Sequence, residues 1–268
     1  MKQVNIPGIE LRCSKFALGT ASLFNAGSKD KRYRLLKSAV DAGFTHFDTA
    51  PYYGFGAAER DLNQVLREHP DLTVTTKVGI YSPGGESQFD TAIFLRKVVG
   101  RLIKPISRPT KDFGLSRAKV ALEQSLKRLG RDHIDVYTLH EPDPESFRTD
   151  EWLSWLQDTV KSGKIRYFGI ASTIDRVGPI AEECIGLCQY VQVLDSLEGR
   201  EADLLGRYGL PMQVTYGYVS GARKNGSTAS VEQILSDALK RNKDGAILVS
   251  TLKPERMKQY ARIAETAQ

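Results

Sequence analysis

The sequence contains little cysteine and no long hydrophobic run. Its 268 residues include three cysteines, Cys13, Cys184 and Cys188, and none of them belongs to a C-x-x-C pair. Their odd number and their spacing argue against a disulfide framework and a cysteine metal site, and favour small buried side chains in a reducing compartment. Residues 1–7 lack the apolar core of a signal peptide, and no run could span a bilayer. We therefore expect a cytoplasmic protein with no metal and no membrane partner.

The chain also lacks a strong excess of either charge. The formal net charge is +6, with 26% charged and 41% hydrophobic residues, which is ordinary for a globular protein. Lysine and arginine are spread along predicted helices rather than clustered, so we expect no nucleic-acid partner. A modest positive surplus suits a site for an anionic cofactor.

Short β-type runs alternate with helical patterns after an initial hairpin at residues 4–12, whose turn holds Pro7 and Gly8. The predicted strands cover residues 15–19, a segment ending at Asp48, and residues 72–78, 134–139, 165–171, 191–194, 212–216 and 246–249. The predicted helices cover residues 30–42, 58–68, 116–129, 152–161, 175–185, 201–208, 231–241 and 254–266.

Such alternation predicts a parallel sheet, and eight units without a linker predict one (β/α)8 TIM barrel domain over residues 1–268. The alternative is an open doubly wound sheet. That fold usually carries G-x-G-x-x-G after its first strand, and residues 18–22 do not match this pattern. Two long loops, residues 80–112 after strand three and 217–230 after strand seven, would lie at the catalytic face of a barrel.

Polar side chains stand at the ends of three consecutive predicted strands. Asp48 ends the second strand, Lys77 lies near the end of the third, and His140 follows the fourth. In a barrel these groups would meet at one mouth, within reach of Tyr53. A free phenol has a pKa of about 10, and a nearby ammonium would lower it. An imidazole could donate a hydrogen bond to a carbonyl oxygen and assist proton transfer.

Each group alone has a structural explanation: Asp48 as a turn cap, Tyr53 as an aromatic at the mouth, Lys77 as half of an ion pair and His140 as a satisfied histidine. Four such groups at successive strand ends favour a catalytic site.

The sequence resembles the aldo-keto reductase superfamily over essentially its whole length. The resemblance rests on FDTAPYYG at residues 47–54, TKVG at 76–79, SLKRLG at 125–130, DVYTLH at 135–140 and GKIRYFGI at 163–170. It implies a (β/α)8 barrel that transfers a hydride between a nicotinamide cofactor and a carbonyl or alcohol. The family's catalytic tetrad would be Asp48, Tyr53, Lys77 and His140, with Tyr53 as the general acid. Residues 77–79 and 140–143 resemble the branch that includes aldose and galactose dehydrogenases.

The resemblance also implies cofactor contacts. Ala171-Ser172 replaces the usual Ser-Asn pair, so Ser172 would hold the nicotinamide carboxamide with one hydroxyl. Gln192 would contact the same amide, and Tyr216 would stack on the nicotinamide. Arg256 is placed like the family's 2′-phosphate arginine, which favours NADP(H) over NAD(H). The expected cofactor residues are Gly19, Thr20, Ser172, Gln192, Tyr216, Gly217, Tyr218, Ser220, Ser250, Thr251, Leu252, Lys253, Arg256 and Gln259.

The expected substrate contacts are Phe24, Tyr52 and Tyr81, with the loop at residues 80–112 as a wall. We predict an oxidoreductase that acts with NADP(H) on an aldehyde, ketone or aldose, as a monomer or small homo-oligomer. The alternative is an NADP(H)-binding sensor or regulatory subunit with little turnover, suggested by the altered Ala171-Ser172 pair. A phosphate-binding barrel lyase or isomerase would need catalytic lysine or glutamate placements that the tetrad explains better.

Overall fold

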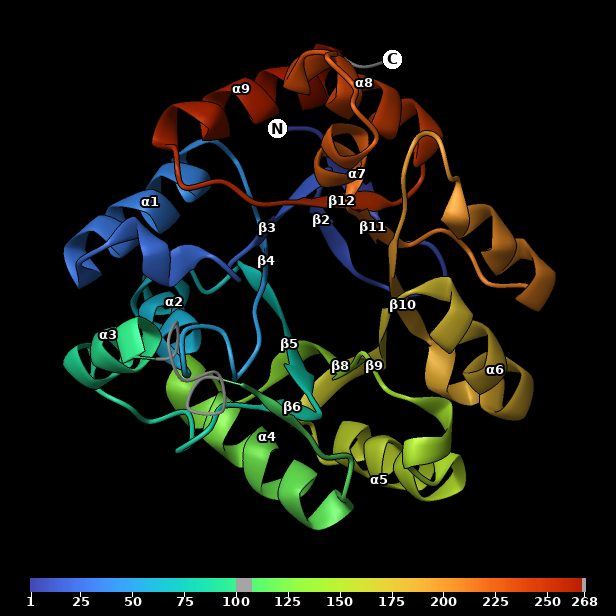
Figure 1. Ribbon diagram of the computed structural model, residues 1–268. Coiled ribbons are helices and arrows are strands. Elements are labelled where there is room, and N and C mark those ends of the chain that lie inside the picture. The colour runs from blue at the N-terminus through green and yellow to red at the C-terminus, as the bar shows by residue number, and fades with distance from the viewer. Residues whose placement is uncertain (100–107, 267–268) are drawn as a thin grey trace.

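The computed structural model describes residues 1–99 and 108–266, and a closed barrel of eight parallel strands forms its centre (Figure 1). The strands are β3 (Phe16–Gly19), β4 (His46–Asp48), β5 (Thr73–Val78), β8 (Ile134–His140), β9 (Ile165–Ser172), β10 (Tyr190–Leu194), β11 (Val214–Tyr216) and β12 (Ala246–Val249). They pair in chain order, and β12 closes the barrel on β3. The predicted (β/α)8 barrel is confirmed.

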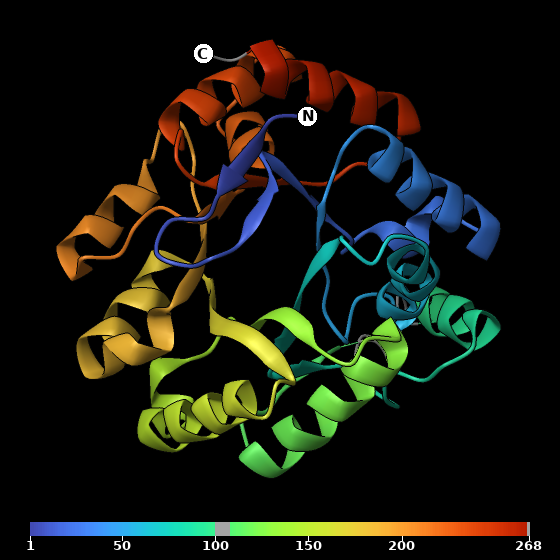
Figure 2. The same ribbon diagram turned by 180° about the vertical axis from the view of Figure 1, so that it is seen from behind.

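Helices surround the barrel (Figures 1 and 2). The longer ones are α1 (Lys29–Asp41), α2 (Ala57–Glu68), α4 (Leu115–Leu129), α5 (Thr149–Lys161), α6 (Ile174–Cys184), α8 (Val231–Arg241) and α9 (Pro254–Thr266). Shorter ones are η1 (Leu23–Ala26), η3 (Pro144–Ser146), η4 (Ile185–Cys188), η5 (Glu201–Tyr208) and α7 (Tyr218–Lys224). The hydroxyls of Ser28 and Ser230 accept backbone amide hydrogen bonds at the starts of α1 and α8, where a helix leaves N–H groups unpaired.

An N-terminal hairpin closes one end of the barrel, which Figure 2 shows from behind. Strands β1 (Gln3–Asn5) and β2 (Arg12–Ser14) pair antiparallel, so the predicted hairpin is present. One buried cluster joins it to the barrel interior: Ile6, Leu11, Cys13, Val136, Tyr190, Val214 and Ala246. The barrel is therefore filled at this end, and its opposite end is left for a site.

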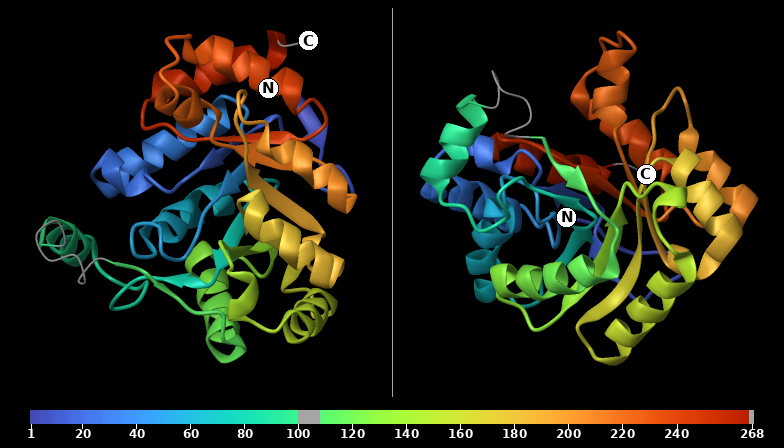
Figure 3. Two further views of the ribbon diagram at one scale, coloured as in Figure 1. Left: turned by 45° about the vertical axis from the view of Figure 1, so that its right-hand side comes forward. Right: turned by 60° about the horizontal axis from the view of Figure 1, so that its bottom comes forward.

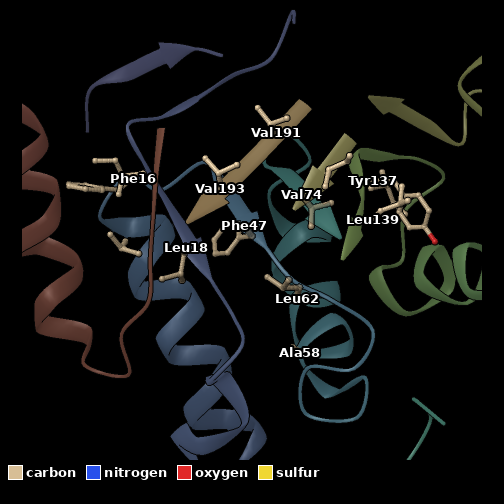
Figure 4. Close-up of a cluster of buried hydrophobic side chains, with 14 of the residues drawn as sticks. Phe16, Leu18, Phe47, Ala58, Leu62, Val74, Tyr137, Leu139, Val191 and Val193 are labelled. Carbon is tan, nitrogen blue, oxygen red and sulfur yellow. The ribbon is translucent and has the colours of Figure 1, made fainter. Parts of the chain in front are cut away.

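Alternate residues of each strand point outward against the helices, because side chains on a strand alternate between its two faces. Figure 4 shows this outer layer, with Phe47 on β4, Val74 on β5, Leu139 on β8 and Val193 on β10. Full burial of such a side chain contributes about 1.5–3 kcal/mol. The outer layer thereby fixes which residues of the same strands face the barrel interior.

The segment after β5 differs from the predicted long loop. Strand β6 (Ile80–Tyr81) pairs antiparallel with β7 (Thr110–Lys111), and α3 (Asp90–Val99) lies between them. Helix α3 packs Ile93 against Phe55 and Ala57 and lies at the outer edge of the molecule (Figure 3). Residues 100–107 of the predicted loop lie outside the described residues. The second predicted loop, residues 217–230, begins with α7.

Across the described ranges, no helix has both the length and the apolar composition needed to cross a membrane. In these same ranges there is no group of three or more His, Cys, Asp or Glu side chains that could hold a metal ion.

Candidate active site

Three neighbouring strands bring the predicted polar groups to one place. Asp48 on β4 lies opposite Thr75 on β5, and Lys77 on β5 lies opposite Thr138 on β8. Because the barrel interior takes every second residue, Asp48, Lys77 and His140 all face inward at the carboxyl ends of their strands. Together with Tyr53, they line a cavity of about 520 Å³.

Asp48 and Lys77 form a buried ion pair. The Lys77 ammonium donates to Asp48 Oδ1 at 2.5 Å and to the Thr49 carbonyl at 3.0 Å. The side chains of Lys77 and Asp48 are only 2% and 3% exposed. Burial lowers the pKa of Lys77, and the Asp48 charge opposes that shift. The carboxylate therefore stabilises the charged ammonium at a fixed position.

The Tyr53 phenol behaves differently from the prediction. Lys77 Nζ lies 5.2 Å from the centre of the Tyr53 ring, but the pKa of Tyr53 is raised well above its ordinary value. Burial is the main cause, and the charge of Asp48 adds to it. The predicted net lowering of the Tyr53 pKa is therefore wrong, because burial and the Asp48 charge raise it. The phenol keeps its proton near neutral pH, as a proton donor must.

His140 is a neutral imidazole beside this phenol. Its ring lies 5.9 Å from the Tyr53 ring, edge to face, and 5.5 Å from the Tyr52 ring. Burial lowers the His140 pKa well below its ordinary value, and the charges of Lys77 and Lys111 lower it further. Within the described chain its buried Nδ1 has no hydrogen-bond partner.

Polar side chains deeper along β4 and β5 connect the two strands that carry Asp48 and Lys77. His46 lies on the same face of β4 as Asp48, two residues earlier. Its ring nitrogens are 2.7 Å from Thr73 Oγ1 and 2.9 Å from Thr75 Oγ1. Since both threonines belong to β5, the histidine joins the two strands that present Asp48 and Lys77.

The predicted cofactor residues divide into two groups. Those that line the cavity are Gly19, Gln192, Tyr216, Gly217, Tyr218, Ser220, Ser250 and Arg256. Those outside its lining are Thr20, Ser172, Thr251, Leu252, Lys253 and Gln259. Thr20 is buried and donates its hydroxyl to the Asp48 carbonyl at 3.0 Å.

Ser172 faces away from the cavity. Ala171 lines the cavity, so the next residue of β9 points to the opposite face of the strand. Ser172 is fully buried, and its hydroxyl has no partner among the described residues. The alternation of side chains along β9 predicts this orientation of Ser172. The family resemblance concerns only the residue types of the pair and not the direction in which they point.

The predicted substrate residues also separate. Tyr52 lines the cavity, whereas Phe24 packs against the buried cluster that contains Phe55. Tyr81 lines a different cavity of about 270 Å³, where the Arg117 guanidinium lies 3.9 Å from the centre of its ring. Tyr81 therefore lies outside the cavity of the tetrad, whereas Lys111, near the other end of the same segment, contacts the Glu141 carbonyl.

An ion pair behind the cavity anchors α7. Asp195, which follows β10, is fully buried and accepts a hydrogen bond from the Tyr218 hydroxyl at 2.6 Å. It also pairs with Arg241 of α8 at 2.6 Å. Gly217 makes the turn before α7 with φ +104, where a side chain would also meet Leu194. The start of α7 is thus held at the cavity wall.

Sequence reasoning missed three polar residues of this region: Asp195, Glu141 and Arg223, of which the last two line the cavity. Glu141 directly follows His140, so its position beside the end of this predicted strand was the available signal. Arg223 stood in a predicted loop, and its guanidinium donates to the Ser227 carbonyl at 2.6 Å and the Ala229 carbonyl at 2.7 Å.

The sequence is similar to those of several known proteins. A sequence model of the aldo/keto reductase family matches residues 15–190. D-threo-aldose 1-dehydrogenase from a Pseudomonas species is 32% identical over 168 residues, covering 59% of this chain and 49% of that protein. L-glyceraldehyde 3-phosphate reductase from Escherichia coli is 30% identical over 176 residues, covering 60% of this chain and 42% of that protein. The matched part thus spans just under half the length of these curated relatives.

Solved structures show the same fold. The holo form of the aldo-keto reductase AKR11C1 from Bacillus halodurans superposes with a TM-score of 0.76 at 20% identity, covering 99% of this chain and 91% of that one. A glycerol dehydrogenase from Gluconobacter oxydans gives a TM-score of 0.73 at 20% identity, covering 97% of this chain and 89% of that one. At such identities the likeness is evidence for the barrel fold alone.

Proposed function

Because the chain belongs to the aldo/keto reductase family, we propose that it is a nicotinamide-dependent oxidoreductase that interconverts a carbonyl group and an alcohol. One observation carries the proposal. Asp48, Tyr53, Lys77 and His140 converge on a single cavity although they come from separate parts of the chain. Membership of the family would not by itself require that all four side chains be present and line one cavity.

The chemistry follows from the protonation states of these groups. The protonated Tyr53 phenol can deliver a proton to a carbonyl oxygen, and neutral His140 can donate a hydrogen bond to the same oxygen. The Lys77 ammonium, held by Asp48, stabilises the phenolate that remains after the proton has left. For alcohol oxidation the same phenolate takes the proton back.

The cavity offers the contacts that a nicotinamide dinucleotide needs. Tyr216 presents an aromatic ring, Gln192 presents an amide, and Arg223 and Arg256 present guanidiniums suited to phosphates. When bound, the nicotinamide supplies or accepts the hydride. Tyr216 would support its ring and Gln192 its carboxamide. Ser172 faces away from this cavity, so we assign no carboxamide contact to it.

We propose NADP(H) as the favoured cofactor because Arg256 lines the cavity from the first turn of α9. A planar guanidinium fork binds a phosphate monoester through two hydrogen bonds. NAD(H) has no 2′-phosphate and would leave this group without its partner.

The proposed substrates are aldehydes, ketones or aldoses. Two relatives named above act, by their names, on an aldose and on a phosphorylated hydroxyaldehyde. The aldose is uncharged and the phosphorylated aldehyde is charged, so the two relatives support both kinds of substrate. We further propose a cytoplasmic monomer or small homo-oligomer, consistent with three unpaired cysteines.

The test combines cofactor binding with a proton-donor variant. Purified protein is titrated with NADPH and with NADH by intrinsic fluorescence, and we expect tighter binding of NADPH. Turnover is then measured on a panel of aldehydes and aldoses for the wild type and for Tyr53→Phe. Loss of a general acid lowers the rate by roughly 10²- to 10⁴-fold.

Tyr137→Phe is the matched control, because its buried phenol has no hydrogen-bond partner among the described residues and lies outside the cavity lining. This variant should turn over like the wild type. Full activity of folded Tyr53→Phe would contradict the mechanism. Stoichiometric NADP(H) binding without turnover of any substrate would instead favour the sensor or regulatory function.

A further inference from the structure

Glu141 places a carboxylate at the cavity that holds the tetrad. It directly follows His140 at the end of β8, and it lines the same cavity as Tyr53 and Tyr52. Its side chain is 51% exposed, so the carboxylate is open to a ligand entering from solvent.

The backbone of Glu141 is held in an unusual conformation. Its φ is +47, in the left-handed region that residues other than glycine rarely adopt and that costs about 1–3 kcal/mol. Three hydrogen bonds fix it there. Its amide donates to the Ala171 carbonyl at 2.9 Å, and its carbonyl accepts from Lys111 Nζ and Arg176 Nη1, each at 3.0 Å. The direction in which the side chain leaves the backbone is therefore set by the surrounding elements.

The carboxylate keeps acceptor capacity for a ligand. Lys111 Nζ is 3.9 Å from a Glu141 carboxylate oxygen, beyond hydrogen-bond distance, and 3.7 Å from Asp143. Arg176 makes its short contact, at 2.5 Å, with Asp143 instead. The two cations therefore leave the Glu141 carboxylate oxygens without a close hydrogen bond among the described residues.

The charge of Glu141 reaches the reacting groups. Burial is the main cause of the raised pKa values of Tyr52, Tyr53 and Tyr216, and the charge of Glu141 raises all three further. These tyrosines line the cavity where a substrate would bind. A negative charge felt at all three positions would also act on a substrate placed among them.

Resting on the oxidoreductase function proposed above, we propose that Glu141 determines specificity for uncharged polyhydroxy carbonyl substrates. An ionised carboxylate only accepts hydrogen bonds, and those from a substrate hydroxyl are stronger than bonds between neutral groups. The same charge disfavours a substrate that carries a phosphate or carboxylate close to its carbonyl group. Of the two substrate types named by the relatives, the geometry points to the uncharged one.

The experiment uses three substrates that differ in one feature each: D-glyceraldehyde, propanal without hydroxyls, and D-glyceraldehyde 3-phosphate. Values of kcat/KM are measured for the wild type, Glu141→Gln and Glu145→Gln. Glu145 is an exposed carboxylate on η3 outside the cavity lining, so its variant is a control for the same change of charge.

We expect Glu141→Gln to lower the preference for glyceraldehyde over propanal by about tenfold, which corresponds to one charge-assisted hydrogen bond at a partly exposed site. It should raise the relative rate on the phosphorylated substrate, while Glu145→Gln leaves both ratios unchanged. If propanal is reduced but both ratios are unchanged in Glu141→Gln, the specificity role is refuted and the oxidoreductase function stands.

A second measurement separates the two proposals in the absence of turnover. Saturation-transfer NMR compares the binding of glycerol with that of glycerol 3-phosphate to the wild type and to Glu141→Gln. We expect the wild type to favour glycerol and the variant to lose this preference. Equal preferences in the two proteins would overturn the role of Glu141 whether or not any carbonyl is reduced.

Discussion

The ion pair between Asp48 and Lys77 allows the contribution of charge to folding and to catalysis to be separated. Both side chains are at most 3% exposed, and Asp48 Oδ2 is buried without a hydrogen-bond partner in the described chain. Lys77→Met would remove the ammonium and leave this carboxylate uncompensated. Breaking a buried pair from one side costs about 3–5 kcal/mol. We expect Lys77→Met to fall in the upper part of that range, because the remaining charge has so little other support.

Asp48→Asn should cost less, because Lys77 keeps the Thr49 carbonyl at 3.0 Å and the new amide oxygen can still accept a hydrogen bond. The double variant, Asp48→Asn with Lys77→Met, removes both charges and retains similar volumes. Replacing a buried ion pair by neutral groups is often nearly neutral for stability, so we expect the double variant to lie within about 2 kcal/mol of the wild type. The two losses are therefore far from additive.

The assay is urea unfolding followed by the fluorescence of Trp152 and Trp155 on α5, with turnover measured on the same samples. A stability of about 5–15 kcal/mol is typical of a folded domain, so a loss of 4 kcal/mol is easily resolved. The double variant should be folded and inactive. If it were destabilised by the sum of the two single losses, the charges would not be coupled and the reasoning would be refuted.

Two further predictions concern acid and the anchor of α7. Burial lowers the pKa values of His46 and His140, so the unfolded chain takes up protons below its histidine pKa of about 6.5 while the folded chain does not. Stability should therefore be full above pH 6.5 and fall below it. An unchanged urea midpoint between pH 7.5 and 5.5 would contradict this, and His46→Gln should reduce the slope. Asp195→Asn should destabilise the protein by about 2–4 kcal/mol and weaken cofactor binding, because Arg241 is left buried beside a neutral amide. Asp203→Asn, which removes a half-exposed partner of the same arginine, should have a much smaller effect on both calorimetric stability and binding.

The barrel could be predicted from the sequence because each of its strands and helices has a local sequence pattern. Each strand shows as a short apolar run, and the inward residues follow from counting in twos along it. The positions of Asp48 and Lys77 at the ends of consecutive predicted strands place them at the mouth of a barrel, and the structure joins them at 2.5 Å. The ends of α8 and β12 agree with the prediction because Ser230 caps the helix and because Ala246–Val249 is a continuous apolar run.

The remaining features depend on groups distant in sequence. Asp195 and Arg241 are 46 residues apart, and nothing local in either segment indicates their contact. The left-handed conformation of Glu141 is imposed by Lys111 and Arg176, which approach its carbonyl from two other elements. The rise in the Tyr53 pKa depends on burial, which only the folded chain determines.

The raised pKa of Tyr53 affects which direction of the reaction the site favours. In the resting site the phenol is protonated and His140 is neutral, so both can donate to an oxygen in the cavity. A carbonyl oxygen needs two donors of this kind, because negative charge develops on it as the hydride arrives. An alcohol needs a base, and burial together with Asp48 opposes formation of the phenolate. Under the proposed mechanism the electrostatics therefore suit carbonyl reduction at neutral pH, and alcohol oxidation should gain as the pH rises toward the phenol's raised pKa.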